Sequence, residues 1–420
     1  MAWILFALLF VFLFIGLPVA VAIGLSALFV LLKNGVPIAI VAQRMFAATD
    51  SFPLIAVPFF ILVGDLLSQG KISERLIELA DSVFGFLKGG LSVAAVFSSM
   101  FIAAISGSGA ATTAAVGTSL IPELKKRGYD TASSAALTAA AGTIGVVIPP
   151  SVPMVLYAVV ANESVAKLFL NGFLPGVGMG LILIFIALRE AHKRNYPKGK
   201  AFSLKNIWLT FKKAFFGLLA PIIILGGIFS GFFTPSEAAV VAVDYTLILI
   251  LFVYRTMKPK ELIKLIIRSA MTMSIVMFLI AVAGVFGWVL ANWNIPSTIA
   301  NAILSLSDNR YVIMLLIAVI ILIAGVFMET ASAILILTPV FLPVVKQCGV
   351  NLIHFGIIET VGFAIGMVTP PVAINLYVAT SITGLSMEKI SKSVVPYLFG
   401  LILVFLLVVY LPLFVPGLIM

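Results

Sequence analysis

Charged residues are scarce in this sequence, at 10% of its 420 residues, whereas 62% are hydrophobic. So little polar surface could not cover the core of a water-soluble protein of this length. The composition therefore excludes a soluble enzyme or a soluble binding protein and indicates a membrane protein.

Cysteine and histidine are almost absent. The one cysteine, Cys348, excludes an intramolecular disulfide framework and a multi-cysteine metal site. His192 lies in a basic loop and His354 near a predicted outer end, so neither is placed to activate the Ser-Gly-Ser-Gly stretch at 106 to 109 as in an intramembrane serine protease. No Gly-Lys-Ser/Thr pattern of a P-loop occurs. We therefore predict no enzymatic activity, no ATP hydrolysis and no organic cofactor.

Long apolar runs dominate the chain. Examples are Trp3 to Leu32, Phe215 to Phe229 and Val394 to Leu413, and about 20 such residues cross a bilayer as a helix. The first run lacks a basic leader and a clear cleavage site, so we interpret it as a retained first helix rather than a signal peptide. The sequence predicts an all-α polytopic membrane protein.

The net charge of +10 would suggest nucleic-acid binding in a soluble protein. Here the Lys and Arg residues lie between apolar runs, where they set orientation in the membrane. We therefore predict no nucleic-acid partner. The basic segment 191–213 is interpreted as a cytoplasmic loop with an interfacial helix, and contact with membrane lipid headgroups or docking of a partner is the alternative role.

The sequence repeats itself in one ungapped register, with Pro122 and Pro343 lying 221 residues apart. The other matching residues are Lys125 and Lys346, Gly128 and Gly349, Gly145 and Gly366, Pro149-Pro150 and Pro370-Pro371, and Pro175 and Pro396. Frequent Gly and Pro in membrane proteins is the alternative explanation, but it does not account for a single shared offset.

The repeat predicts the domain organisation. Each unit is expected to contain two helices, a re-entrant helical hairpin, a broken helix and a final helix. The predicted boundaries are 1–190 for repeat one, with hairpin one at about 91–123 and a broken helix at about 131–160, then the linker 191–213, and 214–420 for a linking helix plus repeat two, with hairpin two at about 312–344 and a broken helix at about 352–380.

The positive-inside rule predicts that the second unit is inverted relative to the first. With the loop after Arg189 placed inside, 21 of the 26 Lys and Arg residues fall inside. The five outside are Lys33, Arg44, Lys167, Arg310 and Lys346. This assignment puts the N-terminus in the cytoplasm.

Paired breaks in matching segments of two repeats are a strong sequence indicator of a transporter's binding site. The segments are AAAGTIGVVIPPSVP at 139–153 and FAIGMVTPPVA at 363–373. Gly and paired Pro open the helix there and free carbonyl oxygens, which are ligands for Na⁺. The hydroxyls of Thr143, Ser151 and Thr369 lie beside the breaks. A kink that only shapes packing is the alternative.

The hairpin tips differ between the two units. The register pairs Ser106, Gly107 and Ser108 with Phe327, Met328 and Glu329. Hydroxyls at the second tip would have to come from Thr330 and Ser332. An intramembrane acid is a functional candidate, and Glu329 is the best single one. The acids Asp65, Glu237, Asp244 and Glu359 are less clear, because each could lie near a helix end or pair with a basic neighbour.

The sequence resembles the large membrane subunit of tripartite ATP-independent periplasmic (TRAP) transporters, the DctM-like family, in order over nearly its whole length. The matching segments are FPLIAVPFFILVGDLL at 52–67, AISGSGAATTAAVGTSLIPELKKRGYD at 104–130, AGTIGVVIPPSVPMVLYA at 141–158, FTPSEAAVVAV at 233–243, AILILTPVFLPV at 333–344 and GMVTPPVAINLYVA at 366–379.

This resemblance implies a Na⁺-driven importer of an organic acid, of the sialic acid or C4-dicarboxylate class, in the bacterial inner membrane. It implies the ion-transporter superfamily fold and an elevator movement. It also implies two partners, a small four-helix membrane subunit, expected here as a separate polypeptide, and a periplasmic substrate-binding protein. A stand-alone Na⁺-coupled carboxylate carrier is the alternative, and an intramembrane enzyme is a third class for which no nucleophile and base pair is present.

The resemblance also implies ligand sets with two or more coupling Na⁺ ions. The implied sites are Ser106, Ser108, Gly142, Val147 and Pro149 for one Na⁺; Gly325, Met328, Gly366, Thr369 and Pro370 for the other; and Ser108, Ser151 and Glu329 for the substrate. The family more often has Asp where Glu329 stands and lacks an acid where Glu359 stands.

Overall fold

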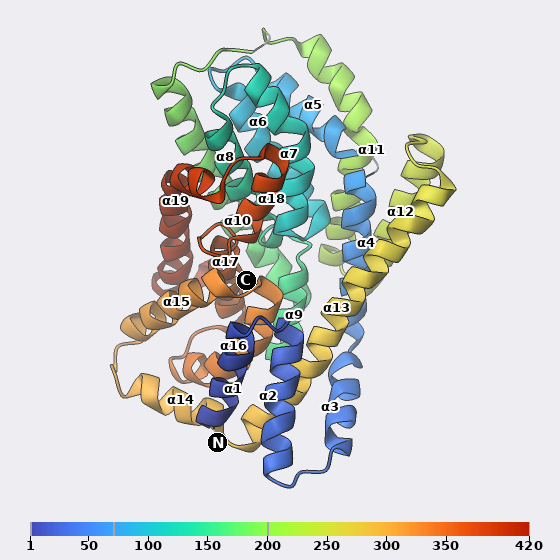
Figure 1. The fold of residues 1–420 in the computed structure, drawn as a ribbon. Helices are drawn as coiled ribbons and strands as arrows, with labels where there is room; N and C mark the ends of the chain where they lie inside the picture. Colours follow the sequence, from blue (N-terminus) through green and yellow to red (C-terminus); the bar gives the residue numbers. More distant parts are fainter. Residues whose placement is uncertain (1, 70–71, 200, 420) are drawn as a thin grey trace.

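The computed structural model describes residues 2–69, 72–199 and 201–419, and these form helices joined by turns (Figure 1). Within these ranges, seven helices are long and apolar enough to cross a membrane, or eight if one bent pair counts as a span. The predicted all-α polytopic class is confirmed.

Repeat one runs from scaffold helices into a hairpin and a broken helix. The scaffold comprises α1 (Ala2–Phe14), α2 (Val19–Lys33), α3 (Ala39–Thr49) and α4 (Ala56–Gln69), followed by the short α5 (Ile72–Phe84). Hairpin one is α6 (Gly90–Ser106) and α7 (Gly109–Lys126), the broken helix is α8 (Thr131–Gly142) and α9 (Val152–Ala161), and α10 (Val165–Lys193) closes the unit.

Repeat two follows the same order. Its scaffold comprises α11 (Leu204–Phe229), α12 (Pro235–Ile248) and α13 (Pro259–Asn292), followed by α14 (Ile295–Leu304). Hairpin two is α15 (Arg310–Phe327) and α16 (Thr330–Gln347), the broken helix is α17 (Leu352–Gly366) and α18 (Ile374–Thr383), and α19 (Met387–Phe414) comes last.

The helix ends keep the register seen in the sequence. Shifting α7, Gly109–Lys126, by 221 residues gives the bounds of α16, Thr330–Gln347, at both ends. Figure 1 shows α6 and α7 in the upper half of the molecule and α15 and α16 in the lower half. The two hairpins thus lie at opposite ends, which is the arrangement of an inverted repeat.

The first apolar run forms two helices, so the interpretation of one retained helix is wrong. Helix α1 ends at Phe14 and α2 begins at Val19. Between them, Gly16 has a φ of +88° and Pro18 is extended, with ψ 138°. Proline cannot donate to the preceding turn, so the helix stops there.

Two short helices, which the sequence did not predict, precede the hairpins. In α5, Ile72, Leu76, Ile77 and Ala80 are buried, while Glu74 and Glu78 on its other face are exposed. This spacing is that of an amphipathic helix. Helix α14 occupies the equivalent place in repeat two.

The scaffolds of the two repeats differ in one bend. Helix α3 and the segment from Phe52 meet at 71°, with Pro53 starting a short 3₁₀ turn over Phe52–Ile55. The matching stretch of repeat two is the single 34-residue helix α13. The last part of the basic segment 191–213 is helical and continuous with the linking helix, because α11 begins at Leu204.

A polar network centred on Glu190 ties α8, α10 and α19 together. Its carboxylate accepts hydrogen bonds from the Ser133 hydroxyl and, at 2.7 Å, from the Tyr397 hydroxyl, and it pairs with Arg194 at 2.8 Å. Tyr397 is buried. Hydrogen bonds to charged groups in such surroundings are stronger than neutral ones.

We expect Tyr397→Phe to lower the free energy of unfolding by about 1–3 kcal/mol, because it removes a buried hydrogen bond to a carboxylate. Thermal unfolding of the purified protein in detergent measures the change. Glu388→Gln breaks the exposed Glu388–Lys392 pair on the same helix and should leave the transition unchanged. Equal stability of Tyr397→Phe and the unmodified protein would show that the network contributes nothing.

Candidate functional site

The tip of hairpin one is a tight turn of small residues. Helix α6 ends at Ser106, and Gly107 takes a φ of +59° that favours glycine. Ser108 is the N-cap of α7, where its hydroxyl accepts from the Ala111 amide at 3.4 Å. The Ser106 hydroxyl lies 2.8 Å from that of Thr112. Ser108 therefore lies at the N-terminus of α7, and Ser106 lies at the C-terminus of α6 with its hydroxyl against the first turn of α7.

The first break follows α8. A 3₁₀ turn covers Thr143–Val146, the Pro149-Pro150 peptide bond is cis, and α9 starts after Ser151. Every residue of this stretch is buried. The Ser151 hydroxyl donates to the Val146 carbonyl and accepts from the Met154 amide. Its hydroxyl thus caps α9 in this structure, and its contact with substrate stays a prediction.

Hairpin one packs directly against the first break. A Cβ on Gly145 would come within 2.6 Å of both the Ser108 carbonyl and the Thr112 hydroxyl, so only glycine fits at this approach. The Pro150 carbonyl also lies against Gly107, because a Cβ on Gly107 would be 2.8 Å from its oxygen. The Val147 carbonyl lies against Gly172 of α10. Of the residues predicted for Na⁺ site one, Ser108 and Gly142 lie where hairpin one packs on this segment, whereas the Val147 carbonyl faces α10.

The tip of hairpin two has the same form with different chemistry. Helix α15 ends at Phe327, Met328 is extended, and Glu329 is the N-cap of α16. The Glu329 carboxylate accepts from the Ala331 amide at 3.0 Å and the Ser332 amide at 3.3 Å. A carboxylate at a helix N-terminus is favoured by the unpaired amides there.

The second break repeats the first in outline. Helix α17 ends at Gly366, the Pro370-Pro371 bond is cis, and α18 begins at Ile374. The Thr369 hydroxyl donates to the Ile365 carbonyl at 2.8 Å. Gly366 touches the backbone of Gly325 so closely that a Cβ would overlap its carbonyl group. The structure thus brings the predicted residues of Na⁺ site two together at the crossing of α15 and α17.

The two halves differ in two ways at this site. Ser108 and Glu329 occupy the same register position and the same N-cap, so the hydroxyl of one repeat is replaced by a carboxylate in the other. The first break is buried, whereas Pro370, Pro371 and Val372 of the second are exposed. The second break is the accessible one in this conformation.

The sequence analysis missed Asn375, which joins the two breaks. Its side-chain amide donates to the Ala139 carbonyl of α8 at 3.1 Å, and its backbone amide donates to the Met367 carbonyl. The side chain is buried and its Oδ1 has no partner among the described residues. An amide inside the apolar run INLYVA was the available signal.

The remaining acids occupy different environments. Asp65 accepts a hydrogen bond from Ser269, Asp244 is exposed, and Glu237 forms a capping box with Thr234 at the start of α12. Glu359 is buried and accepts from Thr338. Glu237 therefore has a structural explanation. Within the described residues, no group of three or more His, Cys, Asp or Glu side chains could hold a metal ion.

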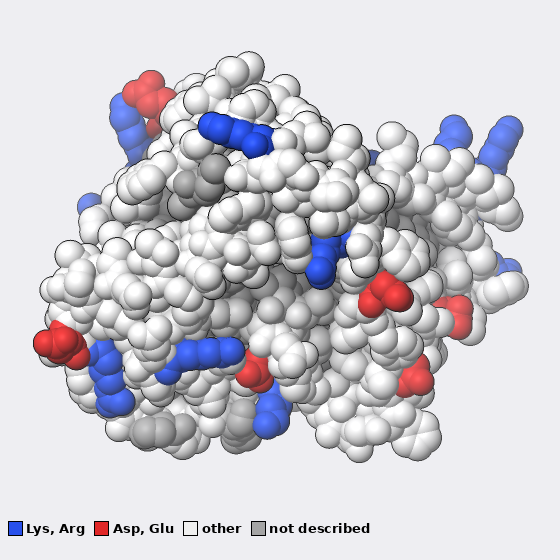
Figure 2. Space-filling model, turned by 90° about the horizontal axis from the view of Figure 1, so that it is seen from below, with Lys and Arg blue, Asp and Glu red and all other residues white. Residues whose placement is uncertain are grey.

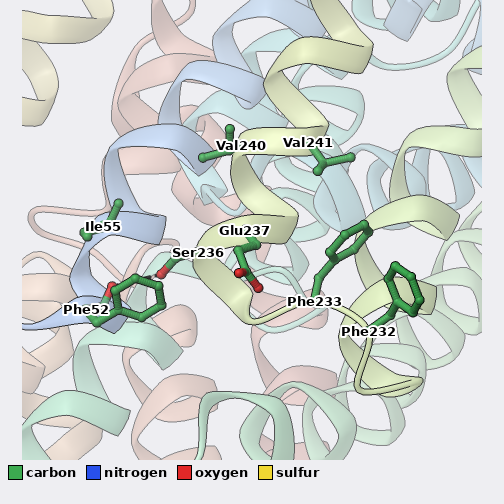
Figure 3. Close-up of a pocket in the computed structure, with 8 residues that line it drawn as sticks. All are labelled: Phe52, Ile55, Phe232, Phe233, Ser236, Glu237, Val240 and Val241. Atoms are coloured by element: carbon green, nitrogen blue, oxygen red, sulfur yellow. Dashed lines mark hydrogen bonds between the residues drawn. The ribbon is translucent and has the colours of Figure 1, made fainter.

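A polar cavity of about 440 Å³ borders the first turns of α7. Ala110, Ala111 and Ala114 line it from hairpin one, and Asp65 and Arg268 line it from scaffold helices α4 and α13. A second cavity, of about 470 Å³, is mostly apolar and lies between the 3₁₀ turn at Phe52–Ile55 and the start of α12, with Phe52, Phe233 and Glu237 in its wall (Figure 3). It contains none of the predicted ion or substrate residues.

The described residues at the lower end of the molecule carry charged side chains at scattered positions. In Figure 2 this end is mostly uncharged, and its Lys and Arg side chains are scattered around a central hollow.

Comparisons with known proteins agree over nearly the full chain. Residues 6–414 match the family described as "Tripartite ATP-independent periplasmic transporter, DctM component". The chain is 43% identical over 412 residues to an isethionate TRAP transporter permease protein DctMQ of Oleidesulfovibrio alaskensis, covering 97% of this chain but 65% of that protein.

Two other relatives are covered almost completely. A C4-dicarboxylate TRAP transporter large permease protein DctM of Pseudomonas aeruginosa is 41% identical, over 93% of this chain and 92% of that protein. A sialic acid TRAP transporter large permease protein SiaM of Vibrio cholerae is 36% identical, over 96% of this chain and 94% of that protein.

Solved structures share the fold at low identity. The YdaH transporter of Alcanivorax borkumensis has a TM-score of 0.66 at 14% identity, covering 90% of this chain and 88% of that one. The efflux pump MtrF of Neisseria gonorrhoeae has a TM-score of 0.62 at 12% identity, covering 91% of this chain and 83% of that one. The chain therefore belongs to the family of the DctM component, the large permease of tripartite ATP-independent periplasmic transporters.

Proposed function

We propose that this permease imports a small organic anion by using a Na⁺ gradient, with one Na⁺ site at each tip-to-break contact. One observation carries the proposal: each hairpin packs onto a broken helix at the same register position, Gly145 in repeat one and Gly366 in repeat two. Backbone that leaves helical geometry inside a membrane is tolerated only where it is buried in protein or lines a cavity. Paired breaks of this kind are where secondary transporters bind substrate and coupling ions.

The first Na⁺ site is assigned to Ser106, Ser108, Gly142, Val147 and Pro149. Its support is the close approach of Gly145 to the Ser108 carbonyl, which concentrates carbonyl and hydroxyl oxygens in one buried place. The second site is assigned to Gly325, Met328, Gly366, Thr369 and Pro370. Its support is the Gly325 and Gly366 contact beside the Thr369 hydroxyl. Oxygen ligands of this type suit a hard monovalent cation.

The substrate is proposed to bind between the two tips, near Ser108, Ser151 and Glu329. The N-terminus of α7 presents backbone amides, which favour an anionic group; at α16 the Ala331 and Ser332 amides bond to Glu329. Glu329 would accept hydrogen bonds from substrate hydroxyls. Relatives are named for isethionate, C4-dicarboxylates, sialic acid and 2,3-diketo-L-gulonate, so an organic acid of the C4-dicarboxylate or sialic acid class is the proposed substrate.

TRAP large permeases generally work with a small permease and a periplasmic binding protein. We propose the same partners here, a four-helix membrane subunit and a binding protein that delivers the substrate. The hairpins and broken helices would move against the scaffold helices as an elevator. A stand-alone carrier of the same fold is the alternative, and uptake without a binding protein would favour it.

The first test is uptake by proteoliposomes that contain this chain, its small permease and its binding protein, with radiolabelled succinate and N-acetylneuraminate as probes. We expect accumulation of one probe with an inward Na⁺ gradient and none when K⁺ replaces Na⁺. Equal uptake in K⁺ would contradict Na⁺ coupling. Omitting the binding protein is the control that separates the tripartite mechanism from a stand-alone carrier.

Na⁺ binding is testable without knowing the substrate. A ligand that binds only the folded state stabilises it, by about 2.7 kcal/mol at 100 times its dissociation constant. We expect the unfolding temperature to be higher in NaCl than in KCl, and Thr369→Val to reduce that difference. As a control, Thr383→Val removes a hydroxyl that makes the same kind of hydrogen bond to a carbonyl four residues earlier. It should leave the difference between NaCl and KCl unchanged. If both variants keep the full difference, Thr369 is not a ligand.

The chain is a multi-pass inner-membrane protein, and we propose that its basic segment after Arg189 is cytoplasmic. The first apolar run forms two helices, and Figure 1 shows the N-terminus at the end opposite this segment, so the N-terminus is then periplasmic and not cytoplasmic as the sequence predicted. Cys348, at the end of α16, is then periplasmic. We expect a membrane-impermeant maleimide to label Cys348 in intact spheroplasts. Lys193→Cys in a Cys348→Ser background should be labelled only after permeabilisation. The reverse pattern would overturn the orientation.

A further inference from the structure

Glu359 is an ionisable side chain in the buried interior of a membrane protein, where a charge is costly. It is fully buried in α17, and its Oε2 accepts a hydrogen bond from the Thr338 hydroxyl of α16. Its Oε1 is buried with no partner among the described residues. Glu359 is also absent from the ion and substrate sets, lying seven residues before Gly366 on the same helix.

The equivalent position in repeat one shows that packing does not require an acid. The 221-residue register pairs Thr338 with Gly117 and Glu359 with Thr138. Gly117 and Thr138 also lie in contact, because a Cβ on Gly117 would be 3.5 Å from the Thr138 methyl group. The same helix-to-helix contact is therefore made by a glycine and a methyl in one repeat and by a hydroxyl and a carboxyl in the other.

No charged group compensates Glu359. The helices packed against α17 are α15, α16, α19, α10 and α9, with the 3₁₀ turn at Thr143–Val146. Their titratable side chains are Arg310 and Tyr311 on α15; Glu329 and Lys346 at α16; Glu388, Lys389, Lys392, Tyr397 and Tyr410 on α19; Lys167, Arg189, Glu190, His192 and Lys193 on α10; and Tyr157 on α9.

Within the part of the chain that the structure describes, none of these forms an ion pair or hydrogen bond with Glu359. The Tyr157 hydroxyl donates to the Leu352 carbonyl. On α17 itself, His354 is bonded to the Val408 carbonyl. An ionised carboxylate with one hydrogen bond and no cation is strongly disfavoured in such surroundings.

We propose that Glu359 is a proton-binding site between hairpin two and its broken helix, neutral while α16 and α17 are packed together. The bound proton removes the charge, and the neutral carboxyl keeps its hydrogen bond with Thr338. Separation of α16 from α17 would admit water, stabilise the carboxylate and release the proton. Protonation therefore favours the packed arrangement of hairpin two, and alkaline pH favours its opening. This inference rests on the contact itself and not on Na⁺ coupling.

Infrared spectroscopy of the purified full-length chain in lipid nanodiscs tests the proposal directly. A neutral carboxylic acid has a carbonyl stretch above the amide bands, and that stretch shifts to lower frequency in D₂O. At neutral pH in choline chloride we expect this band in the unmodified protein and its loss in Glu359→Gln. Glu388→Gln makes the same chemical change at an exposed site and should keep the band.

Three results would overturn the proposal. One is that Glu359→Gln and the unmodified protein give the same spectrum in this region. Another is loss of the band from the unmodified protein when NaCl replaces choline chloride, which would assign Glu359 to a cation. If Glu359→Gln does not fold, Thr338→Val decides: loss of its hydrogen bond should move the band to higher frequency, and an unmoved or absent band contradicts the assignment.

Discussion

Backbone amides and carbonyls in the middle of a membrane have no water to bond with, and this constraint organises the whole molecule. Four chain segments leave helical geometry near the centre, two at hairpin tips and two at Pro-Pro breaks. They are tolerated because they are packed in protein: Gly145 of the first break lies against Ser108, and Gly366, which precedes the second break, lies against Gly325 near the end of α15. The surrounding long helices hold these contacts in place, and their ends repeat with one offset.

Within that symmetric frame, the two repeats have diverged in the chemistry of equivalent positions. The N-cap of the second hairpin helix is a hydroxyl at Ser108 and a carboxylate at Glu329. The contact between hairpin and broken helix is apolar at Gly117 and Thr138 and polar at Thr338 and Glu359. Both acids lie in repeat two, whose break is the exposed one. The acid proposed to contact substrate and the proposed proton site thus lie in one half, while the proposed ion sites and substrate hydroxyl contacts involve both.

Asn375 explains how the halves are joined at their centre. It begins the second part of one broken helix and bonds to the carbonyl of Ala139 in the other. A buried amide contributes to stability only when its hydrogen-bond partners are in place, because an unsatisfied amide is costly in an apolar interior. The bond therefore couples the position of the accessible break to that of the buried one.

The sequence by itself determined the class of protein, the repeat and the positions of the breaks. These depend on composition, on a fixed offset and on Gly and Pro, whose effects on the backbone are local. It did not determine the division of the first run at Gly16 and Pro18, the amphipathic helix α5, or the partners of single polar residues. Ser151 caps its own helix, Glu237 completes a capping box, and Glu359 meets Thr338. Those outcomes were decided only by the tertiary structure, because each depends on which groups lie within bonding distance after helices far apart in sequence have packed together.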